Sequence, residues 1–280
     1  MSSGVADLWG PSFAGLVISL AMYGTSVGQY IYYVISFPGS TDLNSIKAFV
    51  FSVMLFNTVH TYVSVAFFWM MLVSGHNSFT HILLMPWQLA MVLLCYCITF
   101  IVQSFYAHKV WIISGRSWFV TAIVLALAAA QMVVGSVCVS IGLRTQSTDA
   151  LFGSRLSGAG ALLSVFCDTL ITGVVYYYLR PKRWGVRRKE SVFRHLTMIF
   201  VQMGLLTCMT SLLMFILFCV QGQKLYTGGP GVILSKSYVN SLLAVLNARK
   251  TIRDRRKAHI TTIELPTIPV SSDSTSTTDI

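Results

Sequence analysis

The chain has 280 residues, of which 55% are hydrophobic and only 10% are charged. Water-soluble domains draw about a quarter of their residues from Asp, Glu, Lys and Arg, so this composition excludes an ordinary soluble domain and predicts a surface that faces lipid. The net charge of +11 does not indicate nucleic-acid binding, because the basic residues lie between apolar segments, where they meet acidic headgroups.

Seven segments are predicted to cross the membrane, since a helix needs about 20 mostly apolar residues to span the hydrocarbon core. In chain order they are 13–35, 48–73, 87–111, 118–143, 156–179, 196–220 and 232–252. Residues 1–12 are predicted to form an extracellular N-terminus. Residues 257–280, rich in Ser and Thr, are predicted to form a disordered cytoplasmic tail. The expected fold is all-α, a polytopic membrane protein with a seven-transmembrane-helix bundle.

The seventh segment is the least apolar, because Lys236, Asn240 and Ser241 interrupt it. Charge distribution nevertheless favours a seventh span. With seven spans and the amino terminus outside, sixteen of the twenty Lys and Arg residues fall on the cytoplasmic side. Cytoplasmic loops carry such an excess of positive charge. The sequence therefore predicts an extracellular N-terminus, a cytoplasmic C-terminus and a location in the plasma membrane rather than in internal membranes.

Polar residues inside the spans mark the interior of the bundle, because each costs a few kcal/mol when it faces lipid. A rise of about 1.5 Å per residue places Asp168, His60 and Asn240 in a middle layer. The inner layer, nearer the cytoplasm, contains Gln29, Asn57, Gln103 and Asn247. Asp168 is expected to pair with His60, or with Lys236 if that side chain bends inward. Lys236 is also predicted to lie only about 6 Å below the outer boundary, where it can reach water. The simpler alternative is that these side chains only join helices by hydrogen bonds.

Four motifs are distributed along the chain. They are Gln29-Tyr30 with Tyr33, Gln103-Ser-Phe-Tyr-Ala-His-Lys-Val-Trp111, Asp168-Thr-Leu-Ile-Thr172, and Lys236-Ser-Tyr-Val-Asn240 with Asn247. Together they resemble a large family of seven-span proteins from mushroom-forming fungi, classed as a domain of unknown function, over roughly Pro11 to Arg255. Members of that family tend to have Asp where this chain has Asn57, and Arg where it has Lys109. The resemblance implies the architecture and a membrane location, and it supplies no ligand, substrate or reaction.

The leading functional hypothesis is a receptor-like sensor of a small molecule or lipid, without enzymatic activity. The alternative is a transporter or channel in which Asp168 and His60 carry a proton or cation. An intramembrane enzyme is disfavoured, because a zinc hydrolase needs several His residues and a carboxylate at one metal. His60 is the only His predicted inside the core. No metal and no cofactor are expected, and Lys236 is predicted too shallow for a retinal Schiff base.

Membrane lipids are the expected partners. A basic cytoplasmic segment is predicted to contact acidic headgroups. Its residues are Arg180, Lys182, Arg183, Arg187, Arg188 and Lys189. Docking of a cytoplasmic signalling protein is the alternative, and the sequence does not identify such a partner. No nucleic acid is expected.

Overall fold

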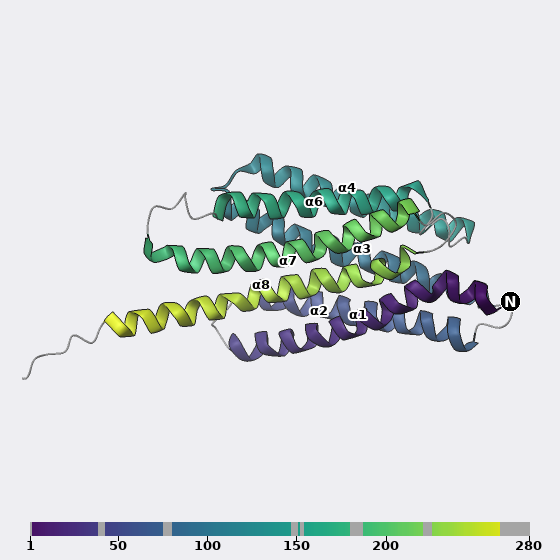
Figure 1. Ribbon diagram of the computed structural model, residues 1–280, viewed down its shortest axis with the longest axis horizontal. Coiled ribbons are helices and arrows are strands. Elements are labelled where there is room, and N and C mark those ends of the chain that lie inside the picture. The colour runs from purple at the N-terminus through teal and green to yellow at the C-terminus, as the bar shows by residue number, and fades with distance from the viewer. Residues whose placement is uncertain are drawn as a thin grey trace, which may run out of the picture.

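The structure, a computed structural model, describes residues 2–38, 43–74, 80–146, 151, 154–179, 187–220 and 226–263. The described residues form seven long α-helices, and a short π-helical segment, η2 (Met70–Ser74), continues the second of them. The helices are α1 (Ser2–Ser36), α2 (Asn44–Trp69), α3 (Thr80–Ile113), α4 (Trp118–Thr145), α6 (Arg155–Leu179), α7 (Arg187–Val220) and α8 (Gly228–Ile263). They run along one common long axis (Figure 1).

The helices bury polar residues and expose apolar ones, the reverse of a water-soluble bundle, and α2 shows this clearly. Its exposed face carries Phe51, Leu55, Val59 and Tyr62. Its buried face carries Asn57, His60, Thr61 and Ser64. Within a bilayer the apolar face meets lipid and the polar face finds its hydrogen-bond partners inside the protein.

Within the described part of the chain, five helices are long and apolar enough to cross a membrane, and a shorter apolar helix covers Gly204–Val220. The five candidate spans are Gly10–Ser36, Asn44–Leu72, Pro86–Ile113, Trp118–Thr145 and Arg155–Leu179. These findings confirm an all-helical protein with several membrane spans. The number seven and the direction of the spans stay predictions.

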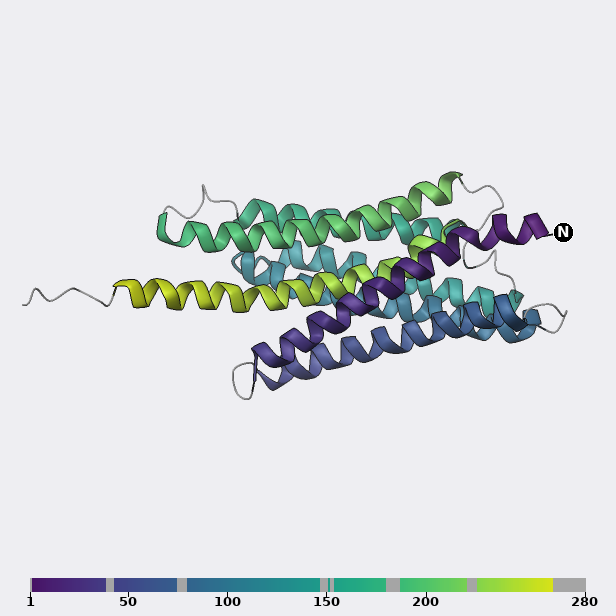
Figure 2. The ribbon, with the colours of Figure 1, turned by 60° about the horizontal axis from the view of Figure 1, so that its bottom comes forward.

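Helix α8 is the central element of the bundle. It packs against α1, α2, α3 and α7, and both ribbon views place it between α7 and α1 (Figure 2). Most of its side chains from Val232 to Leu246 are buried. This helix therefore has little need of apolar residues that face lipid, which explains why hydropathy identifies it poorly.

The start of α8 differs from the predicted span in a way that matters for Lys236. The sequence Gly228-Gly229-Pro230-Gly231 is typical of a loop, yet here it forms the first turn of the helix, where Pro is tolerated. Gly229 lies against α1, and a Cβ on Gly15 would clash with its backbone. Because α8 begins at Gly228, Lys236 lies about 12 Å along the helix. The depth of Lys236 in the membrane stays a prediction.

At its other end α8 continues to Ile263, past residue 257, where the disordered tail was predicted to begin. Residues 264–280 of that tail lie outside the described residues. The guanidinium groups of Arg249 and Arg253 lie 5.0 and 5.3 Å from the ring centroid of Phe37, the residue that follows α1. Cation–π contacts thus join the basic end of α8 to the end of α1.

Candidate functional site

Lys236 is fully buried and forms the centre of a first polar cluster. Its Nζ donates to Oδ1 of Asn57 at 2.9 Å and to the Asn57 carbonyl oxygen at 3.0 Å. It also lies 2.6 Å from Oγ1 of Thr61 and 3.1 Å from Nδ1 of His60. The Tyr23 ring faces the ammonium with its centroid 5.6 Å away. We call Lys236, Asn57, His60 and Thr61 the lysine cluster.

Asp168 is the centre of a second cluster. The Tyr238 hydroxyl donates to both carboxylate oxygens, at 2.9 and 3.0 Å. Nε2 of Gln103 lies 3.4 Å from Oδ1 of Asp168 and donates to the Tyr238 hydroxyl oxygen at 3.1 Å. The Ser164 hydroxyl is 2.8 Å from that same oxygen. We call Asp168, Gln103, Tyr238 and Ser164 the aspartate cluster.

Two predicted residues, Asn240 and Asn247, hold α8 against α1. Nδ2 of Asn240 donates to the Met22 carbonyl oxygen, and Nδ2 of Asn247 donates to the Gln29 carbonyl oxygen, each at 2.9 Å. Gln29 and Asn247, both assigned to the inner layer, thus meet through the backbone of Gln29. These bonds join helices, and neither asparagine takes part in the two clusters.

The structure does not group the predicted polar residues into the middle and inner layers that were expected from their depths. Asn57 joins His60 and Lys236, whereas Gln103 joins Asp168. Among the described residues Asp168 bonds to neither of its predicted partners, His60 and Lys236. The reason is that the position of a residue along its helix axis fixes only its depth. Two side chains come into contact only if they also lie on helix faces that are turned toward each other. Lys236 and Tyr238 are two residues apart on α8, so they point to nearly opposite sides.

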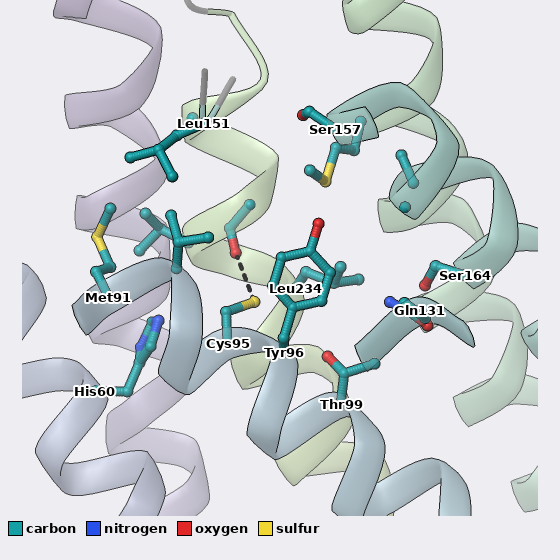
Figure 3. Close-up of a pocket in the computed structure, with 17 residues that line it drawn as sticks. His60, Met91, Cys95, Tyr96, Thr99, Gln131, Leu151, Ser157, Ser164 and Leu234 are labelled. Atoms are coloured by element: carbon teal, nitrogen blue, oxygen red, sulfur yellow. Dashed lines mark hydrogen bonds between the residues drawn. The ribbon is translucent and has the colours of Figure 1, made fainter. Parts of the chain in front are cut away.

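A cavity of about 40 Å³ lies between the two clusters, bounded by α2, α3, α4, α6, α7 and α8. Figure 3 shows the His60 ring rising beside Met91 on one side, with Gln131 and Ser164 near each other on the other. Thr99 lies between these sides. The apolar part of the wall includes Met91, Val92, Leu151, Val232 and Leu234.

Three buried polar atoms of this wall have no hydrogen-bond partner among the described residues. They are Nε2 of His60, Oγ1 of Thr99 and Oε1 of Gln131. Leaving a buried polar group unsatisfied costs about 1–3 kcal/mol. A cavity with mostly apolar walls and a few polar groups is typical of a small-molecule site.

The predicted basic contacts fall largely beyond what the structure describes. Arg180, Lys182 and Arg183 lie outside the described residues. Arg187, Arg188 and Lys189 form the first turn of α7. Within the described ranges no group of three or more His, Cys, Asp or Glu side chains is placed to hold a metal ion.

Sequence reasoning did not identify Thr61, Tyr238, Ser164, Thr99 or Gln131 as site residues. Considered without its neighbours in the sequence, Tyr238 could equally be a tyrosine at the membrane–water interface. Its position within a polar stretch of α8, next to Ser237 and two residues from Lys236 and Asn240, was the available signal for a buried hydroxyl.

The fold and the polar interior together describe a helical membrane protein with several spans. Comparison with protein families finds a match over residues 164–251, to a Family of unknown function (DUF6534). The matched segment contains Asp168, Lys236 and Tyr238, and it extends from α6 through the buried part of α8. The searches of curated proteins and of solved structures find no match.

Proposed function

We propose that the chain is a receptor-like sensor that crosses the plasma membrane seven times, with its N-terminus outside and its C-terminus in the cytoplasm. A small molecule binds in the cavity between the lysine and aspartate clusters. The observation that carries this proposal is the cavity itself, whose wall includes Gly228, Gly231, Val232 and Leu234 of α8. Binding therefore acts on the central helix of the bundle.

Helix α8 is suited to transmit such binding. It contacts four other helices and continues from the cavity to the basic residues Arg249, Lys250 and Arg253. A rigid helix held on several sides moves as a unit when one end is displaced. The basic end would report this movement to acidic lipids or to a cytoplasmic partner. Such a readout needs no chemical reaction, in keeping with a non-enzymatic role.

The motifs outside the matched segment support a wider family relationship. Gln29-Tyr30 and the segment beginning at Gln103 precede residue 164, where the match starts. We infer that the relationship extends over roughly Pro11 to Arg255 and that the chain has a fungal origin.

The sensor is tested by filling the cavity. Gly231 lines it, and a Cβ at this position meets no atom within 4 Å, so the Cβ of Gly231→Val has room and the side chain adds volume there. Gly173→Val is the matched control, because Gly173 also has open space but lies in a groove between α6 and α7. Hydrogen exchange of residues 249–263 is measured in nanodiscs with a panel of carboxylates, amides, alcohols, amines and lysolipids.

At least one panel member is expected to change exchange at this end of α8 in the wild type and in Gly173→Val. The same compound should have no effect on Gly231→Val. A panel without any effect, or an effect that persists in Gly231→Val, would overturn the sensor proposal.

A transporter is the second candidate, because the cavity touches both clusters through His60 and Ser164. This arrangement differs from direct pairing of Asp168 with His60, because these two side chains share no hydrogen bond among the described residues. Proton or cation flux into proteoliposomes that falls in Asp168→Asn, with folding retained, would favour transport. Flux equal to that of empty liposomes would count against it.

A further inference from the structure

The ammonium of Lys236 has no negative partner among the described residues. Its neighbours are the oxygens of Asn57, Oγ1 of Thr61, Nδ1 of His60 and the ring of Tyr23. All of these are neutral acceptors or an aromatic face, which suits a positive charge without neutralising it. A buried charge without a counter-ion makes its surroundings favourable for an anion.

His60 connects this charge to the cavity. A lysine ammonium has only hydrogen atoms to donate, so Nδ1 of His60 accepts from Lys236 and the proton of the neutral ring lies on Nε2. His60 is one of the residues around the cavity, and its Nε2 is buried and has no partner within the described part of the chain. The ring therefore presents a single N–H donor to the cavity, with a positive charge directly behind it.

From this geometry we infer that the cavity binds a small organic anion, a short-chain carboxylate, whose oxygen accepts the Nε2–H of His60. The inference rests on the proposed ligand site and names its ligand class. A hydrogen bond to an ionised acceptor is roughly twice as strong as one between neutral groups. The charge of Lys236, one ring away, adds to the attraction in surroundings where water does not screen it.

The remainder of the wall fits the other end of such a ligand. Met91, Val92, Leu151 and Val232 offer apolar contact for a short alkyl chain. A cavity of about 40 Å³ suits a ligand of only a few non-hydrogen atoms. Acetate and propionate are therefore the best probes.

The only described carboxylate near this region is kept from the cavity. Asp168 is not part of the wall, because Ser164 lines the cavity and Tyr238 stands between that serine and the carboxylate. Both oxygens of Asp168 accept hydrogen bonds from Tyr238. An anion in the cavity thus meets the His60 donor and not the aspartate.

Binding of acetate and propionate to the purified protein in nanodiscs is measured by calorimetry, with acetamide and propionamide as neutral analogues of the same shape. The carboxylates are expected to bind at least about tenfold more tightly than the amides, as charged hydrogen bonds predict. Lys236→Met and His60→Phe should each weaken carboxylate binding about tenfold or more. His60→Gln, which can place an N–H donor at a similar position, should retain more affinity than His60→Phe.

Asn247→Leu is the control variant, because it removes a half-buried polar side chain where α8 packs against α1 and Asn247 does not line the cavity. It should bind carboxylates as the wild type does. Equal binding of carboxylates and amides, or undiminished carboxylate binding in Lys236→Met, would overturn the anion proposal. If an amide or alcohol binds instead and Gly231→Val abolishes that binding, the sensor proposal stands while the anion proposal fails.

Discussion

The lysine and aspartate clusters each bury a charged side chain that has no oppositely charged partner among the described residues, but they do so differently. Lys236 takes its hydrogen-bond acceptors from one helix, α2, and Asn57 alone supplies two of them. Asp168 takes its donors from three helices, with Gln103 on α3, Thr207 on α7 and Tyr238 on α8. The lysine cluster thus depends heavily on one neighbour, whereas the aspartate cluster shares its contacts among three helices.

The largest effect is expected from Asn57→Leu, which removes one acceptor of a buried ammonium. Hydrogen bonds to charged groups contribute about 1.5–3 kcal/mol, so the free energy of unfolding should fall by about 3 kcal/mol. Adding Lys236→Met should recover most of that loss, because the cation that needs the acceptor is gone. The measurement is unfolding of the purified protein in mixed detergent micelles. Simple addition of the two single effects would show that Asn57 does not act through Lys236.

A smaller effect is expected from Tyr238→Phe, which removes the hydroxyl that bonds to Asp168 and Ser164. The free energy of unfolding should fall by about 2 kcal/mol, since Gln103 still donates to the carboxylate. Tyr176→Phe, at an exposed tyrosine, is the control and should change stability by less than about 0.5 kcal/mol. A loss as small as that of the control would mean that the aspartate cluster adds nothing to stability.

The smallest effect is expected at the basic end of α8, outside both clusters. Arg253→Ala removes a cation–π contact with Phe37 and should cost about 0.5 kcal/mol. Combined with Lys236→Met, its effect on unfolding should simply add, because the two sites share no partner. Coupling between them would indicate that the lysine cluster and the end of α8 respond to each other.

Much of the fold could be predicted from the sequence, because lipid imposes a strong rule on composition. The segments that became α1, α2, α3, α4 and α6 are long and apolar, and their apolar faces meet lipid as hydropathy requires. Helix α8 obeys a different rule. Its polar residues meet other helices, so packing and not hydropathy decides its place, and only the charge distribution indicated a span there.

The candidate site was predictable in its residue types but not in its groupings. Lys236, His60, Asn57 and Asp168 were identified as buried polar residues because each is costly in lipid. Their partners depend on the rotation of α8 about its axis, which a single sequence does not give. The predicted span began at residue 232, whereas α8 begins at Gly228, close to α1.

A helix as polar as α8 does not partition into a bilayer by itself. A single Lys at the centre of an isolated helix disfavours insertion by about 2.5–3.5 kcal/mol on scales measured at the translocon. Helix α8 also follows the other six in the chain, so its binding surfaces on α1, α2 and α3 exist before it is synthesised. This last helix is therefore expected to insert only after the earlier ones. An internal deletion within α2 should leave α8 at the membrane surface.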